Sequence, residues 1–161
     1  MKCLHSRCVK MITAFASFVL IFSSCEKDNI PDQSFNLDVI LREGKSVGYL
    51  KFRQDPDPAK VIDLEIKVAY LLPNHEYLLQ RAVDAINDVD GNCTSTIWLT
   101  LGKGLVSQSI MTDKFGSGHE NLWRDITAVA TGSKFDIHFQ VVDASNMEVV
   151  LTSDCYDYEV R

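Results

Sequence analysis

The chain has 161 residues, with 16 basic and 22 acidic side chains and a net charge of −6. A chain of this length suits one domain with its own hydrophobic core. The acidic excess repels phosphate backbones and anionic head groups, so it argues against a nucleic-acid partner and against membrane binding through basic patches.

The first residues have the organisation of an export signal. Lys2, Arg7 and Lys10 are basic, and twelve uncharged residues follow, ending at Phe22. A basic start before a short apolar run is typical of a secretory signal peptide. The run is shorter than the roughly 20 apolar residues of a membrane-spanning helix. We therefore expect an exported protein that loses residues 1–24.

Ser23-Ser24-Cys25 resembles the lipobox of bacterial lipoproteins, although Phe22 stands where that family prefers Leu. The resemblance covers the signal region and the first polar residues after Cys25. It implies cleavage before Cys25 and acylation of that residue, which would anchor the protein to the bacterial cell envelope, at the outer membrane, on its periplasmic or its surface face. Loss of residues 1–24 leaves 13 basic and 22 acidic residues, a net charge of −9.

The cysteines then fall into separate groups. Cys3 and Cys8 leave with the signal peptide, and Cys25 carries the lipid. Cys93 and Cys155 remain as an even pair in an oxidising compartment, so we predict a disulfide between them. The alternative is a pair of buried free thiols.

Residues 25–34 are polar, contain Pro31 and lack periodicity, as expected of a tether. From residue 35 on, apolar and polar residues alternate with the period of two that is typical of half-buried strands. Strands are expected at residues 35–42, 47–54, 62–68, 76–83, 96–101, 106–112, 121–126, 135–141 and 147–160, the last range holding one strand or two.

Residues 71–77 have the spacing Leu-x-Pro-x-x-x-Tyr, which resembles the tyrosine corner of fibronectin type III domains and related Greek-key sandwiches. The resemblance implies that Tyr77 begins a strand, expected at 76–83, and bonds back to the backbone of the preceding turn. A helix over 74–89 is the alternative, because Leu and Ala there favour helix and Asn74 could cap it.

The expected domain is therefore all-β and spans residues 35–161, as an antiparallel immunoglobulin-like or Greek-key β-sandwich of about nine strands. Residues 75–141 are similar to small secreted bacterial β-sandwich proteins. The similarity lies in the Tyr77 strand, in a mid-chain Cys before a Trp strand, and in a Thr-Asp-x-x-Gly-x-Gly hairpin, here 112–118. This similarity implies a β-sandwich fold and export from the cell, and it implies no specific function.

Few residues point to a metal. His75, His119 and His138 lack the short spacing of metal-binding pairs. Asp88 and Asp90 alternate beside a Gly-containing turn, which is a weak signal for calcium, and a plain acidic turn is the alternative. We therefore expect no bound cofactor.

Trp98 and Trp123 each share a strand parity with polar residues, so both indoles are candidates for a solvent face. There they would serve as stacking platforms or protein anchors. The alternative is that each ring caps the core or an edge.

The spacing Gly-x-Ser-x-Gly occurs once, at residues 44–48, but it lies at the turn between the strands expected at 35–42 and 47–54 and not between a strand and a helix, as a nucleophile elbow requires. The sequence therefore favours a protein without catalytic activity. The pattern favours a lipid-anchored cell-envelope protein whose β domain is a binding or assembly module, with an envelope protein or a glycan as partner. The alternative is a small metal-binding protein or metal-dependent enzyme built on a sandwich.

Overall fold

The alternating residues after position 35 form three consecutive antiparallel strands. They are β1 (Asn36–Glu43), β2 (Ser46–Gln54) and β3 (Val61–Ala69) in the computed structural model, which describes residues 35–56 and 58–161. One parity of each strand is buried and largely apolar, whereas the other is half-buried or exposed, because successive side chains of a strand point to opposite faces.

The remaining strands differ widely in length. The long ones are β4 (Glu76–Val83), β9 (Gly118–Asp125), β10 (Lys134–Asp143), β11 (Val149–Ser153) and β12 (Tyr156–Glu159). The short ones are β5 (Leu99–Thr100), β6 (Gly102–Lys103), β7 (Val106–Ser107) and β8 (Ser109–Met111).

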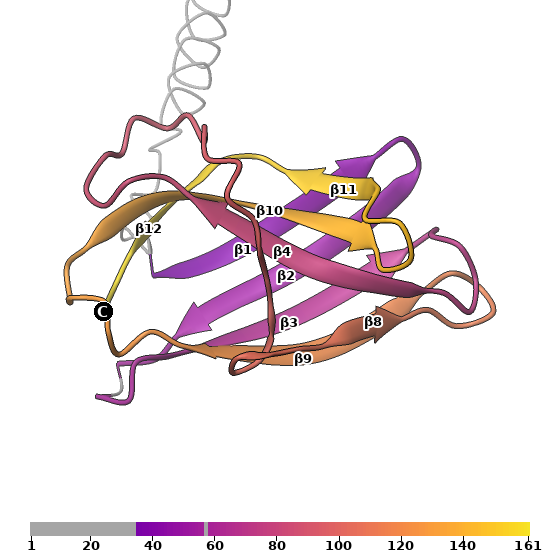
Figure 1. Ribbon diagram of the computed structural model, residues 1–161, viewed down its shortest axis with the longest axis horizontal. Helices are drawn as coiled ribbons and strands as arrows, with labels where there is room; N and C mark the ends of the chain where they lie inside the picture. Colours follow the sequence, from indigo (N-terminus) through magenta and orange to yellow (C-terminus); the bar gives the residue numbers. More distant parts are fainter. Residues whose placement is uncertain (1–34, 57) are drawn as a thin grey trace, which may run out of the picture. The chain divides into compact units, whose positions relative to one another are not determined.

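All twelve strands belong to one hydrogen-bonded sheet in the order β5-β4-β10-β11-β1-β2-β3-β9-β6-β7, with β12 paired to β10 and β8 paired to β4. The pairings are antiparallel except for β6 with β9, which is parallel. The sheet curls into a nearly closed, barrel-like form (Figure 1). Its two flanks, β4 and β9, are bridged by the segment 99–103, which pairs first with β4 and then with β9.

The core lies between the facing halves of this curled sheet. Phe52 of β2 and Phe139 of β10 meet there edge to face, with ring centroids 6.1 Å apart. Apolar side chains from β1, β3, β4, β9 and β11 complete the same cluster. The core and the twelve strands belong to one compact unit, Gln33–Arg161. We therefore treat this unit as able to fold by itself.

The structure confirms that the domain is all-β: the described residues contain no helix. Residues 76–83 form the strand β4, so the alternative helix over 74–89 is wrong. The bond expected of a tyrosine corner is present, because the Leu72 N–H donates to Tyr77 Oη at 3.0 Å. This bond ties the start of β4 to the turn before it.

Two expected strands are wrong in part. Of residues 96–101, Leu99–Thr100 alone pairs as β5, and Ile97 is 83% exposed. Residues 106–112 divide into β7 and β8, which pair with different partners. The physical reason is that this part of the chain passes from the edge of β4 to the edge of β9, so it cannot follow either strand for long. With β6 added in this region and residues 147–160 forming the two strands β11 and β12, the described residues hold twelve strands rather than about nine.

No helix among the described residues is long and apolar enough to cross a membrane.

Candidate functional site

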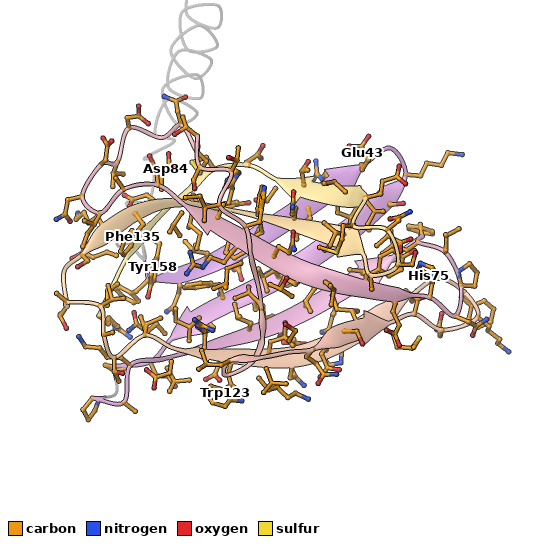
Figure 2. All side chains as sticks on the ribbon, viewed as in Figure 1. Glu43, His75, Asp84, Trp123, Phe135 and Tyr158 are labelled. Carbon is orange, nitrogen blue, oxygen red and sulfur yellow. A yellow bond between two sulfur atoms is a disulfide. The ribbon has the colours of Figure 1, made fainter. Side chains whose placement is uncertain are left out.

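An apolar cavity of about 190 Å³ lies inside the barrel, bounded by residues of both β4 and β9. Its inner wall comes from β2, β3, β10 and the C-terminal strand β12. Figure 2 shows Phe135 and Tyr158, which both line it, close together at one end of the barrel, whereas His75 lies at the other end. We call this space the β4–β9 cavity.

The inner wall of the β4–β9 cavity is aromatic and well ordered by packing. Phe52 contacts Tyr158 edge to face, with ring centroids 4.8 Å apart, and also contacts Phe139. The Tyr158 hydroxyl donates to Gln54 Oε1 at 2.8 Å, and burial raises the pKa of Tyr158. The phenol therefore stays neutral, and this wall offers a ligand apolar ring surfaces.

Two arginines line the same cavity from opposite flanks. Arg81 lies on the inward parity of β4, which it shares with the buried Tyr77 and Leu79. Arg124 lies on the inward parity of β9, which it shares with the buried Leu122. Both arginines are half-buried, whereas the inner wall is almost fully buried, so the charged groups lie on the more accessible side of the cavity.

The two guanidinium groups differ in their partners. Arg124 Nη1 donates to the carbonyl of Gly104 at 3.2 Å, in the turn that follows β6. The guanidinium of Arg81 forms no hydrogen bond or ion pair with any residue that the structure describes. Burial lowers the pKa of Arg81, and the neighbouring charge of Arg124 lowers it further. Arginine nevertheless stays protonated in proteins, so the cavity holds two positive charges.

No acidic side chain is among the described residues that line the β4–β9 cavity. A buried charge is ordinarily paired, because its desolvation is costly. An apolar cavity with a few convergent polar groups is also the usual form of a small-molecule site. The arrangement can therefore hold an apolar group against the inner wall and a negative group beside the arginines.

The cysteines predicted to pair do so in the structure. Cys93 and Cys155 form a disulfide with their Cα atoms 5.4 Å apart. The bond joins the segment 84–98, which follows β4, to the short connection between β11 and β12. Cys25, the expected lipidation site, lies outside the described residues.

The segment 84–98 is fixed by side chains rather than by strand pairing, so residues 96–98 are not part of the strand expected at 96–101. Asp84 accepts hydrogen bonds from the N–H groups of Thr94 and Ser95. These bonds hold the pKa of the Asp84 carboxyl below its usual range, and the bond from Thr94 has the largest effect. The buried Asp136 accepts from the N–H groups of Asp90 and Gly91 through Oδ2. The segment is thereby held beside the ends of β4 and β10.

The two tryptophans both lie outside the barrel interior but do not form one site. Trp98 is half-buried and packs on the ring of His138 on the outward parity of β10, with centroids 4.6 Å apart. Trp123 is 42% exposed on the outward parity of β9, at the lower edge of Figure 2. The turn at Gly104 lies against its ring. Neither indole is among the cavity-lining residues.

The histidines are spread over separate elements. His75 Nε2 lies 2.7 Å from Asp143 Oδ2, and His119 Nε2 lies 3.4 Å from Glu65 Oε1. His138 Nε2 donates a hydrogen bond to the Ser95 carbonyl at 3.0 Å. In the part of the chain that the structure describes, no three or more His, Cys, Asp or Glu side chains gather where a metal could be held.

The weak calcium candidates lie in the acidic turn before Cys93. Asp90 Oδ1 accepts the N–H of Asn92 at 2.8 Å, which is a local bond within the turn, and Asp88 is exposed. The buried Asp136 is nearby through its bonds to this turn, and its Oδ1 has no hydrogen-bond partner among the described residues. These carboxylates do not form a cluster of metal-binding size.

Arg81 and Arg124 were missed in the sequence. A signal for Arg81 was available, since it shares the parity of Tyr77 and Leu79 in the strand expected at 76–83. An arginine at a position where the alternation places apolar, core-facing residues can be recognised in a sequence as an exception to the pattern, because arginine is rarely buried without a partner. Their convergence could not be foreseen, because it depends on how the sheet curls.

A comparison with protein-family models finds no match, and a comparison with curated proteins finds none that is significantly similar.

Proposed function

We propose that the protein is a lipid-anchored component of the bacterial cell envelope, and that its β domain is a non-catalytic binding module that takes a small ligand into the β4–β9 cavity. The observation that carries the binding role is the cavity itself, which has an apolar, aromatic wall and a volume of about 190 Å³. An engineered apolar cavity of about 150 Å³ in another protein is large enough to bind benzene. The space thus suits an aromatic ring or a short alkyl chain.

The envelope location rests on the amino-terminal sequence. A basic start, an apolar run and a Cys at the boundary support export and lipid attachment at Cys25, with the membrane reached through the lipid. The disulfide of the β domain is consistent with an oxidising compartment.

An envelope protein or a glycan is a further partner, for which the exposed Trp123 is the candidate contact. The immunoglobulin-like or Greek-key relationship of the fold is also a proposal, supported by the corner bond of Tyr77.

Lipid attachment is tested in bacterial cells that express the full chain. We expect radiolabelled palmitate to enter the protein and the protein to fractionate with membranes. A Cys25→Ser variant should lose both properties. If the wild-type chain takes up no label and Cys25→Ser is exported as a soluble protein, the anchor is wrong and export alone remains.

Ligand binding in the cavity is tested with 1-hexanol, a neutral probe, on the purified unit Gln33–Arg161. We expect the alcohol to raise the melting temperature, because a ligand that binds only the folded state stabilises it. A Val83→Trp substitution places a large ring where the half-buried Val83 lines the cavity and should abolish the shift.

The control is Val47→Trp, a matched change at an exposed strand position on β2. Circular dichroism and cooperative unfolding show whether each variant folds. The proposal is overturned if 1-hexanol gives no shift with the wild-type unit, or if the shift is the same in the folded Val83→Trp and Val47→Trp variants.

A further inference from the structure

The positive charges of the β4–β9 cavity contrast with the rest of the molecule. The chain has 22 acidic and 16 basic residues, so its surface repels anions on average. Other cations of the domain have acidic partners: Lys51 and Lys67 both pair with Glu65, and Lys103 pairs with Glu120. Arg81 and Arg124 line one space without an acid in its lining.

The positions of both arginines are fixed by the sheet. Arg81 lies opposite Phe139 in the pairing of β4 with β10. Arg124 lies opposite Ile62 in the pairing of β9 with β3, and its bond to Gly104 links it to the turn that directly follows the bridging segment 99–103. The sheet therefore fixes both backbone positions on the flanks of one cavity, where the neighbouring positive charges repel each other.

An anion between the two guanidinium groups would relieve this repulsion and supply the partner that Arg81 lacks. Guanidinium groups suit oxyanions, because their N–H donors match carboxylate and phosphate oxygens in pairs. The adjoining wall of Phe52, Phe139 and Tyr158 is apolar and gives no partner to a second charge. A ligand that satisfies both parts has an anionic head and an apolar body.

We propose that the β4–β9 cavity binds a small amphipathic oxyanion, with its acidic head between Arg81 and Arg124 and its apolar body against Phe52 and Phe139. This inference rests on the proposed binding role of the cavity and names the chemical class of its ligand. The cavity of about 190 Å³ is somewhat larger than the engineered cavity of about 150 Å³ that binds benzene, so it suits an apolar body of about six carbon atoms.

The test is calorimetric titration of the unit Gln33–Arg161 with three probes that each contain six carbon atoms. Hexanoate and hexyl phosphate carry an oxyanion, and hexanamide is the neutral counterpart. We expect at least one anion to bind ten- to a hundredfold more tightly than hexanamide, as about 1.5–3 kcal/mol for a charge-assisted hydrogen bond implies. The affinity ratio of the two anions identifies the head group as carboxylate or phosphate.

Variants assign the preference to the arginines. Arg81→Met and Arg124→Met keep an unbranched apolar stem and remove the charge, so each should reduce the affinity for the anion by roughly tenfold or more and leave hexanamide binding unchanged. Arg42→Met, at an exposed position of β1, should change neither affinity. Arg81→Lys, which retains the charge, should lose less affinity than Arg81→Met and serves if the latter does not fold.

The outcomes separate this inference from the role on which it rests. If hexanamide and both anions bind equally, the cavity is a ligand site but the anion preference is wrong. If an anion binds more tightly but keeps its affinity in both Arg→Met variants, the head group lies elsewhere and the inference is also overturned. If neither the anions nor the neutral probes bind, the proposed binding role fails together with it.

Discussion

Replacing Cys93 and Cys155 by serine should lower the free energy of unfolding by about 4 kcal/mol. The two residues are 62 positions apart in the chain, and a closed loop of that length removes about this much conformational entropy from the unfolded state. The loss is a large part of the roughly 5–15 kcal/mol by which domains of this size are stable. The same change also releases the segment 84–98 from the C-terminal strands.

The measurement is denaturant unfolding of the unit Gln33–Arg161, in which these are the two cysteines. A reducing agent should bring the wild-type unit down to the stability of the Cys93→Ser/Cys155→Ser variant and leave the variant itself unchanged. Mass spectrometry without reductant gives an independent check. Two free thiols in the purified wild-type unit, or equal stability of wild type and variant, would contradict the expectation.

A Phe139→Ala substitution should destabilise the domain by about 3–5 kcal/mol, the range found for large-to-small changes of buried aromatic residues. Phe139 is 1% exposed, contacts Phe52 and lies on the strand that pairs with β4, β11 and β12. Its removal joins new empty volume to the existing cavity, and the sheet around it has little freedom to collapse. The loss of stability should appear as a lower midpoint of chemical unfolding.

Phe115→Ala is the matched control, because this ring is 72% exposed in the loop before β9. A surface change of this kind is expected to alter stability by no more than about 0.5 kcal/mol. Equal effects of the two substitutions would show that the ring of Phe139 does not support the core.

The strands that alternate cleanly were predictable from the sequence. Ile62, Leu64, Ile66 and Val68 are all buried on β3, as their period of two requires, and the strand expected at 76–83 matches β4. Tyr77 makes the expected bond because its corner is a local feature, contained within a few residues. Local periodicity and local hydrogen bonding are what a single sequence records directly.

The region from Cys93 to Lys103 could not be predicted in the same way. Ile97 and Leu99 alternate as in a strand, yet the chain there is held by the disulfide and by Asp84, and it then crosses to another edge of the sheet. The cavity depends on the same long-range feature. Arg81 and Arg124 are 43 positions apart and meet because β4 and β9 become the flanks of one curled sheet.

The bridging segment 99–103 has a consequence for how the protein behaves at high concentration. An exposed sheet edge can pair with the edge of another molecule, which makes long free edge strands a cause of aggregation. Here the strand order ends in β5 and β7, each of two residues, and β5 continues through Leu101 into the segment that reaches β9. Neither terminal strand offers enough backbone to template a neighbour, and this would limit aggregation if the proposed lipid anchor concentrates the protein on a membrane surface.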